Sequence, residues 1–276
     1  MDHADLTVPP GARAGLIPLH PANDPSRGSL LFADLAEQLP RLGVAVLRYD
    51  RRPGEDIPLE AQADDALEAA ADLRAAVGDP ALPIVLWGYS QGAWACLIAA
   101  ARGPGIAALA LLGASGVSPA QQMRYTTERQ LREAGYGEED VADLRRLRTE
   151  GERYIRREQG GSAFQPVIDE YAGRPWFPLA FIPREVPETP EPWEMDFDPA
   201  TLLGQITCPV LAVYGDDDRW VPIDPSIAVF SALPQLEIVR ISGGGHAPTT
   251  DREGGGEVLP QYRDALASWL SRTVLR

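Results

Sequence analysis

The stretch that decides the fold is Pro83-Ile84-Val85-Leu86-Trp87-Gly88-Tyr89-Ser90-Gln91-Gly92-Ala93-Trp94-Ala95. Its apolar first half predicts a buried strand, and the small residues after Gly92 predict a helix. The turn between them has the pattern G-x-S-x-G, which is typical of a nucleophile elbow. A serine at the tip of such a turn crowds the backbone, so the positions two before and two after it must lack a Cβ. Gly88 and Gly92 meet that demand, and Ser90 is the candidate nucleophile.

The helix expected after Ser90 also predicts an anion site. Its first N–H groups have no partner within the helix, and the positive end of the helix dipole lies beside them. Both features stabilise a developing oxyanion. The pattern G-x-S-x-G also occurs in ordinary turns, but the strand before it and the helix after it favour the catalytic interpretation.

Composition bounds the class of protein. The 276 residues carry a formal net charge of −15 at pH 7, which argues against nucleic acid and anionic membranes as partners. No apolar run reaches the roughly 20 residues that span a bilayer, and the acidic N-terminus shows no signal peptide. Cys96 and Cys208 lie far apart, so two free thiols are favoured over a disulfide, as in a reducing cytoplasm. We expect a cytoplasmic globular protein whose oligomeric state the sequence leaves open.

Strands and helices alternate through most of the chain. Besides the run before Ser90, apolar strands are predicted at 14–20, 44–50, 106–112, 209–214 and 236–241. Amphipathic or alanine-rich helices are predicted at 29–41, 59–77, 91–102, 224–232 and 257–273. This alternation predicts an α/β fold in which a mainly parallel sheet has helices on both faces.

The alternation stops between residues 117 and 200. The chain is polar and helical from 119 to 160, and it is rich in proline and aromatic residues from 163 to 200. The simplest account is a helical cap of residues 117–200, inserted into a sheet domain of residues 1–116 and 201–276. Its aromatic residues form either the core of the cap or a substrate pocket, and both alternatives stay open. The pocket candidates are Trp176, Phe177, Phe181 and Trp193.

A serine nucleophile needs a base and an acid. The base takes the hydroxyl proton, and a carboxylate holds the base in the right tautomer. His246 follows the last predicted strand, and the acidic loop Asp216-Asp217-Asp218 follows the strand before it. In a parallel sheet these loops and Ser90 emerge at the same edge. The only other histidines in the sequence are His3, in the N-terminal tail, and His20.

Asp218 is the preferred acid. The spacing Gly215-x-x-Asp218-x-x-Val221-Pro222 gives the chain room to turn and present the third aspartate, whereas Asp216 and Asp217 are expected to cap the turn or face water. Consecutive aspartates lack the spaced oxygen ligands of a calcium loop. No metal site and no cofactor are therefore expected.

Further motifs carry a resemblance to a known family. They are His20-Pro21 with Asp24 and Arg27, then Leu35-Ala36-Glu37-Gln38-Leu39, then Gly43-Val44-Ala45-Val46-Leu47-Arg48-Tyr49-Asp50-Arg51-Arg52. With the order of serine, acid and histidine, they make the chain resemble an α/β-hydrolase, and more narrowly the bacterial serine esterases of the dienelactone hydrolase and prolyl-oligopeptidase-like branch. The resemblance covers roughly 13–116 and 201–273 and extends weakly into 118–150.

This resemblance implies a role for each motif residue that matches. Ser90 corresponds to the nucleophile, Asp218 to the orienting acid and His246 to the base. The backbone N–H groups of Ala22 and Gln91 correspond to the two donors of the oxyanion hole. The resemblance also implies an eight-stranded sheet, of which the short N-terminus here is expected to lack one or two edge strands.

The first oxyanion loop departs from the family pattern. Pro21 stands where the family usually has glycine, and proline has no N–H to donate. Asn23 is expected either to assist through its side chain or to serve the turn. We take His20, Asn23 and Tyr89 as further candidates for the substrate pocket.

Three functions remain open at this point. The first is a cofactor-independent serine hydrolase that cleaves a carboxylic ester or thioester through an acyl-Ser90 intermediate. The second keeps the fold but performs acyl transfer, or lyase or cyclase chemistry, on a natural-product-like substrate. The third is a ligand-binding protein without turnover, for which only Pro21 argues. In each case the partner is a small ester, thioester or acyl compound.

Overall fold

The computed structural model describes residues 4–54, 57–102, 105–191, 193–251 and 254–276. The chain forms two compact units. The sheet unit comprises 1–116, 198–218 and 223–276, and the helical unit comprises 117–197 and 219–222.

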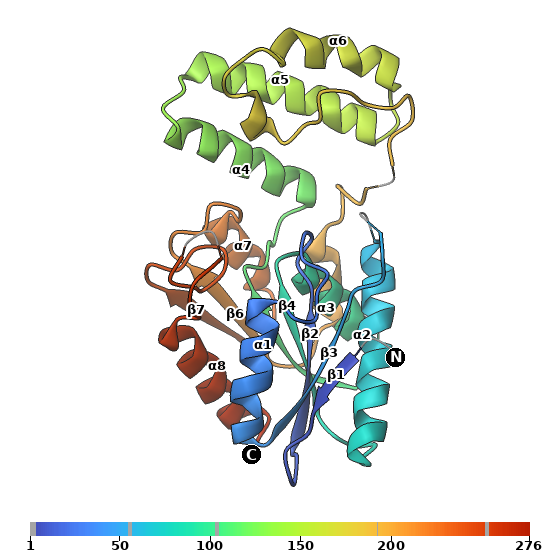
Figure 1. Ribbon diagram of the computed structural model, residues 1–276, viewed down its shortest axis with the longest axis vertical. Helices are drawn as coiled ribbons and strands as arrows, with labels where there is room; N and C mark the ends of the chain where they lie inside the picture. Colours follow the sequence, from blue (N-terminus) through green and yellow to red (C-terminus); the bar gives the residue numbers. More distant parts are fainter. Residues whose placement is uncertain (1–3, 55–56, 103–104, 192, 252–253) are drawn as a thin grey trace. The chain divides into compact units, whose positions relative to one another are not determined.

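The sheet unit contains a seven-stranded sheet in the order β1-β3-β2-β4-β5-β6-β7 (Figure 1). β1 pairs with β3 in antiparallel fashion, and every other neighbouring pair is parallel. The strands β2 to β6 are almost wholly buried, as expected for apolar strands that are covered on both faces. The bounds are β1 Ala4–Thr7, β2 Ala14–Leu19, β3 Val44–Tyr49, β4 Ile84–Tyr89, β5 Ile106–Leu112, β6 Val210–Gly215 and β7 Leu236–Ile241.

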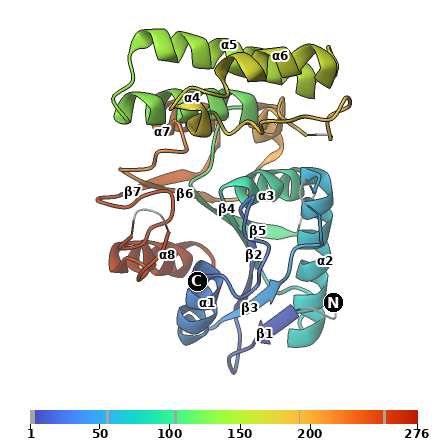
Figure 2. The ribbon, with the colours of Figure 1, turned by 45° about the horizontal axis from the view of Figure 1, so that its top comes forward.

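Helices cover both faces of this sheet (Figure 2). α1 and α8 lie on one face, where their leucine and aromatic side chains share a core with the strands, and α2 and α3 pack together on the other. The helices of this unit are α1 Leu30–Gln38, α2 Leu59–Val77, α3 Gln91–Ala101, α7 Ile223–Phe230 and α8 Pro260–Thr273, with 3-10 turns η1 Leu39–Leu42 and η3 Pro199–Gln205. The predicted α/β class is confirmed.

Local differences from the sequence prediction have local causes. The first predicted helix extends to residue 41, but α1 ends at Gln38 and passes into η1, where Pro40 cannot donate to a helical hydrogen bond. Gly43 then ends the turn at a φ of 84°. α8 begins at Pro260 rather than at 257, because the fixed φ of proline favours the first turn of a helix. Within the described residues the sheet has seven strands, one fewer than the eight that the resemblance implies.

One buried contact anchors the strand that carries the G-x-S-x-G motif. Trp87 on β4 donates its indole N–H to the Tyr262 hydroxyl on α8 over 2.6 Å. The Trp87 ring also packs edge-on against Phe32 of α1, with ring centroids 5.8 Å apart. The central strand is thus fixed to both helices on that face.

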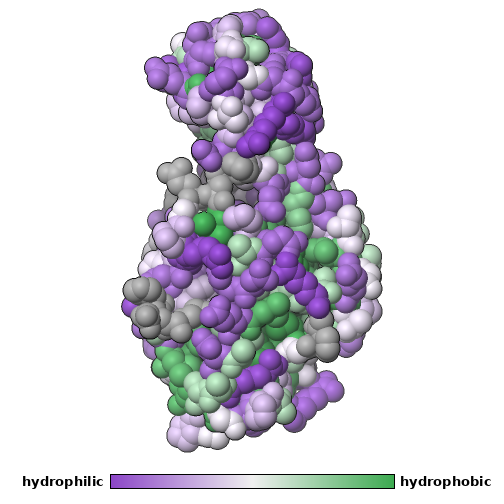
Figure 3. Space-filling model, turned by 90° about the vertical axis from the view of Figure 1, so that its right-hand side faces the viewer, coloured by the Kyte–Doolittle hydropathy of each residue, from purple (hydrophilic) through white to green (hydrophobic). Residues whose placement is uncertain are grey.

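The helical unit is built from amphipathic helices around its own core. α4 spans Pro119–Glu133, α5 Glu138–Ile155 and α6 Gly161–Tyr171, and the 3-10 turn η2 spans Phe177–Ala180. α4 starts with a capping box between Ser118 and Gln121. No strand occurs among the described residues of this unit. Its surface is largely hydrophilic on the face shown in Figure 3. Its core consists of Leu131, Val141, Leu144, Leu147, Tyr154, Phe164, Ile168, Tyr171, Trp176, Phe177 and Ala180.

Candidate active site

The strand order has a switch point between β2 and β4. The chain continues from β2 to β3 on one side, whereas β4 pairs with the other side of β2. At such a switch point the loops after the two strands diverge, and sheets of this kind bind ligands there. The loop after β2 carries Ala22, and the turn after β4 carries Ser90. The two segments that the sequence assigned to the oxyanion hole and the nucleophile are therefore neighbours.

The turn at Ser90 has the backbone of a nucleophile elbow. Ser90 adopts φ 53° and ψ −116°, a conformation that L-residues rarely occupy. A Cβ on Gly88 would lie 2.6 Å from the backbone of Ala93, and one on Gly92 would lie 2.5 Å from the Leu19 carbonyl oxygen. Glycine is therefore required at both positions, as the sequence argument stated.

Asp218 and His246 form a hydrogen-bonded pair. The Asp218 Oδ2 atom lies 2.8 Å from His246 Nδ1. The aspartate side chain is fully buried, and that of His246 is 15% exposed. A buried carboxylate at this distance fixes the orientation and tautomer of the imidazole. Nε2 is then the ring nitrogen that can act as a base.

Backbone contacts between two loops hold this pair together. The N–H of Asp216 donates to the Ile241 carbonyl over 3.0 Å, and that of Asp217 donates to the Gly244 carbonyl over 2.9 Å. A Cβ at Gly215 would lie 2.2 Å from the Gly245 oxygen, so the loops touch directly at this glycine. The loop after β6 and the loop after β7 therefore form one rigid support.

The three aspartates after β6 have different surroundings. The exposed Asp216 forms an ion pair with Arg240 at 2.7 Å, and Asp217 contributes its backbone N–H to the contact between the loops. The side chain of Asp218 is hydrogen-bonded to His246, and its role as the orienting acid stays a prediction.

The His246 ring lies beside the Ser90 turn. Its centroid is 5.1 Å from that of Tyr89, the residue before Ser90. Burial, and then the charge of Asp218, raises the pKa of Tyr89, so this phenol is neutral near His246. On another side, a Cβ at Gly113 would lie 2.9 Å from the ring. Sequence reasoning missed Gly113, although a glycine directly after a buried strand was a usable signal.

Arg51 braces the first oxyanion loop. Its guanidinium donates to the Pro21 carbonyl over 2.8 Å and to the Ala22 carbonyl over 2.7 Å. It also donates to the Gln91 side-chain oxygen over 3.3 Å. One buried cation therefore contacts both residues whose N–H groups form the predicted oxyanion hole. Sequence reasoning quoted Arg51 within a motif but gave it no role.

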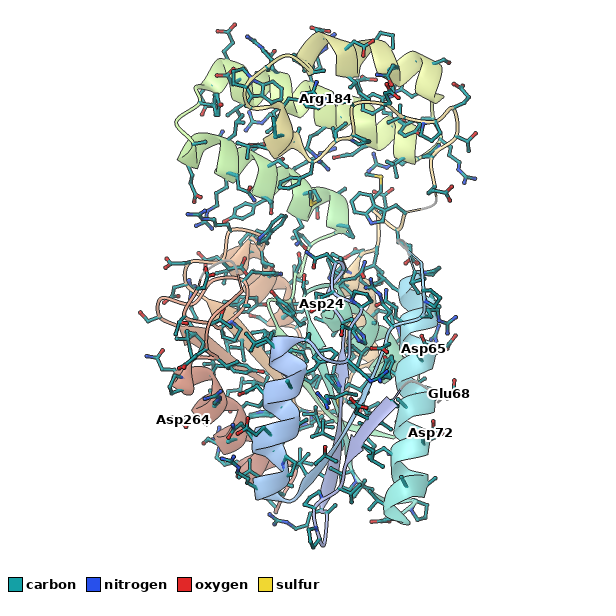
Figure 4. The ribbon with its side chains drawn as sticks, in the orientation of Figure 1. Asp24, Asp65, Glu68, Asp72, Arg184 and Asp264 are labelled. Atoms are coloured by element: carbon teal, nitrogen blue, oxygen red, sulfur yellow. The ribbon has the colours of Figure 1, made fainter. Side chains whose placement is uncertain are left out.

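The exposed tip of the same loop has its own turn contacts. Ala22 and Asn23 are both exposed. Asp24 accepts from the Ser26 N–H over 3.1 Å and lies in the loop that follows β2 (Figure 4). A role of Asn23 toward substrate stays a prediction.

His20 is enclosed in the sheet unit, although the sequence suggested it as a pocket residue. It is 1% exposed, and its ring packs against Phe32 at 4.8 Å and Tyr49 at 5.3 Å between centroids. Burial, and then the charge of Arg51, lowers its pKa to about 4. Its imidazole is therefore a neutral core group at neutral pH.

The four aromatic pocket candidates fall into two groups. Trp176 and Phe177 belong to the core of the helical unit, and the Trp176 indole donates to Asp140 over 2.9 Å. Of the two alternatives, core or substrate pocket, these two residues therefore belong to the core. Phe181 is 47% exposed and packs against Trp220 at 5.4 Å, and Trp193 is half-buried. Contact of Phe181 or Trp193 with a substrate stays a prediction.

The structure also bears on the cysteines, on metal binding and on membrane insertion. Cys96 and Cys208 are both free, as predicted. The described part of the chain contains no group of three or more histidine, cysteine or acidic residues that could hold a metal ion. None of its helices is both long and apolar enough to cross a membrane. His3 lies outside the described residues.

Fold and sequence together define the family. The sequence model of the alpha/beta hydrolase family matches residues 19–255, and the chain belongs to this family of hydrolases. No curated relative matches the chain.

Solved structures of esterases, lipases and peptidases have the same fold. Proline iminopeptidase from Mycobacterium smegmatis is 18% identical with a TM-score of 0.62, over 99% of this chain and 96% of that one. Est1E from Butyrivibrio proteoclasticus is 21% identical with a TM-score of 0.60, over 99% and 94% of the two chains. A monoacylglycerol lipase from Paleococcus ferrophilus is 16% identical with a TM-score of 0.60, over 98% of each chain. At these identities the likeness concerns the fold alone.

The buried His20 predicts an acid-sensitive stability. Its folded pKa of about 4 lies below the ordinary 6.5, so the unfolded chain binds the extra proton between these values. The associated stability is fully present above pH 6.5 and is lost as pH falls toward 4, by about 3 kcal/mol in total. Urea unfolding of the native chain and of His20→Asn between pH 4 and 7 measures this pH-dependent part of the free energy of unfolding. We expect the variant to lose stability less steeply on acidification; equal slopes would contradict the assignment.

Proposed function

We propose that this protein is a serine hydrolase that cleaves a carboxylic ester or thioester through an acyl-Ser90 intermediate. The observation that carries the proposal is the Asp218–His246 hydrogen bond of 2.8 Å, formed beside the strained turn of Ser90. Membership of the alpha/beta hydrolase family and structural likeness to esterases and a lipase support the reaction class.

In the proposed reaction His246 is the base. Its Nε2 takes the Ser90 hydroxyl proton as the oxygen attacks the substrate carbonyl, and the proton then passes to the leaving alcohol or thiol. Asp218 stabilises the imidazolium that forms between these steps, and its complete burial strengthens that interaction. Water, activated by the same histidine, then releases the acid and restores Ser90.

The proposed oxyanion hole uses two backbone N–H groups. Gln91 supplies one at the start of α3, where the helix dipole adds to its effect. Ala22 supplies the other, and the carbonyl oxygens of Pro21 and Ala22 are bound by Arg51. Proline at position 21 is compatible with this arrangement, because it contributes a carbonyl and no N–H is required of it.

Labelling with a fluorophosphonate tests the nucleophile. We expect one adduct per chain, located on Ser90 by mass spectrometry, and hydrolysis of a chromogenic short-chain ester. Ser90→Ala should lose both, while its circular dichroism and melting temperature stay unchanged because the change is small. An adduct on another serine would reject the assignment. Products formed with added alcohols or amines, in the absence of hydrolysis, would favour acyl transfer instead.

Asp218→Asn should lower kcat strongly, while the melting temperature of the variant should change little. An asparagine can present an N–H to His246 Nδ1 and hold the ring in the wrong tautomer, for which losses near 10⁴-fold are known. Asp216→Asn is the matched control, because this exposed neighbour pairs with Arg240 at the surface. Ester turnover and melting temperature of both variants decide the point. Similar losses of kcat in the two variants would contradict a specific role for Asp218.

Arg51→Lys tests whether the loop that carries Ala22 depends on its hydrogen bonds to Arg51. A lysine has a single nitrogen and cannot match the fork that binds two carbonyls and the Gln91 side chain. We expect kcat to fall by about 10²-fold with a smaller change in KM, because a misplacement of about 1 Å costs on that order. Arg52→Lys is the control, since Arg52 pairs with Asp65 and is 47% exposed. Unchanged kcat in Arg51→Lys would show that the loop holds its position without this contact.

A further inference from the structure

The helical unit contains an apolar cavity of its own. The cavity has a volume of about 200 Å³ and lies between α5, α6 and the segment that follows them. A dry cavity of about 150 Å³ holds a benzene molecule, so this one accommodates a ring with a short substituent. Its apolar wall is formed mainly by Ile155, Phe164, Phe181, Ile182, Trp193 and Met195.

A glycine inside α5 borders this cavity. Gly151 lies in the interior of a helix, where glycine is among the least favourable residues. A Cβ at this position would lie 3.1 Å from Phe164 and 3.5 Å from Ile182, both of which line the cavity. The missing side chain therefore keeps space open between α5 and the aromatic wall.

Arg148, one turn before Gly151, supplies a buried positive charge at the same cavity. It is 7% exposed, and its Nη1 atom donates to the Ala180 carbonyl over 2.8 Å. Its Nε atom is buried and has no hydrogen-bond partner among the described residues. Burial lowers the pKa of this guanidinium, and the charge of Glu152 acts in the opposite direction.

The nearest carboxylate is already engaged by other arginines. Glu152 is 1% exposed and accepts from Arg124 Nε over 2.6 Å and from Arg156 over 3.5 Å. Arg156 is in turn paired with Asp196 over 2.6 Å. Arg124 and Arg156 are thus paired with these two carboxylates, and within the described residues no ion pair of Arg148 is found.

Arg184, another arginine of the helical unit, is exposed to solvent and serves as a comparison for Arg148. The Arg184 guanidinium lies 5.3 Å from the Phe177 ring centre, and it donates to the Ala172 carbonyl over 2.8 Å (Figure 4). Water reaches its remaining donors. In Arg148 the Nε atom is instead buried without a partner, and an unpaired buried donor is costly, so a ligand that accepts from this guanidinium would be favoured.

We propose that this cavity binds a small apolar monocarboxylate, with its hydrocarbon part against Phe164 and Trp193 and its carboxylate at Arg148. The ligand supplies the negative charge that the cluster lacks, and the apolar wall selects a hydrocarbon over a sugar or a phosphate. The acid released by ester hydrolysis belongs to this chemical class. The proposal nevertheless stands independently of the reaction at Ser90, because all its residues belong to the helical unit.

Calorimetric titration of the full chain with phenylacetate and with its neutral isostere phenylacetamide tests the proposal. We expect phenylacetate to bind about 10- to 100-fold more tightly, which is the value of a hydrogen bond to a charged group. Equal affinities would overturn the role of Arg148, and the absence of phenylacetate binding would overturn the site.

Two variants locate the binding. Arg148→Met keeps most of the side-chain volume, and removing an unpaired buried charge need not destabilise the fold. It should reduce the affinity for phenylacetate to that for phenylacetamide. Gly151→Leu fills the cavity and should abolish binding of both compounds.

Arg153→Gln is the matched control, because this residue lies on the same helix, is 46% exposed and pairs with Glu150 at the surface. It should bind phenylacetate like the native chain, and thermal melting confirms that each variant is folded. If phenylacetate binds equally well to folded Arg148→Met or Gly151→Leu, the ligand occupies another site and the proposal is wrong. Should Arg148→Met fail to fold, Gly151→Leu and the comparison of the two ligands still decide.

Discussion

The sheet unit depends on a close approach of three backbones at the end of β4. Gly92 at the start of α3 lies so near the end of β2 that a Cβ would come within 2.5 Å of the Leu19 carbonyl oxygen. A Cβ on Gly88 would likewise lie 2.6 Å from the backbone of Ala93 in α3. This packing holds Ser90 at a φ of 53°, a conformation that an isolated turn would relax. The strained backbone of Ser90 is maintained because β4 is central in the sheet. In addition, Trp87 of this strand is hydrogen-bonded to Tyr262.

The other parts of the candidate site are fixed in the same way, by backbone contacts before side-chain contacts. The loops after β6 and β7 are joined through the N–H groups of Asp216 and Asp217, and only then does Asp218 lie 2.8 Å from His246. The loop after β2 is bound through its carbonyl oxygens by Arg51. A site assembled from rigid loops loses little conformational entropy when a substrate binds, which favours a well-defined reaction geometry.

Charged side chains have different surroundings at the surface and in the interior. In the helical unit, arginine and acidic residues pair across the surface, for example Arg145 with Glu128 and Arg174 with Asp143. Such exposed pairs contribute about 0–1 kcal/mol each, so the stability of this unit rests on its apolar core. Charges that are withdrawn from water are few, and each has a particular surrounding. Asp218 contacts His246, Arg51 contacts carbonyl groups, and Arg148 borders an apolar cavity.

Sequence alone determined the features that depend on local order. Hydrophobic periodicity gave the bounds of α2, β5 and β7, and the two glycines around Ser90 gave the elbow. Tertiary structure decided what depends on segments far apart in the chain. Spacing favoured Asp218 among three consecutive aspartates, but the contact of its side chain with His246 depends on the packing of the β6 loop on the β7 loop. Likewise the sequence suggested His20 and Trp176 as pocket residues and gave Arg148 no role, whereas in the structure neighbouring elements bury all three. The burial of an individual polar or aromatic side chain of this kind arises from contacts between distant segments, which a local pattern does not encode.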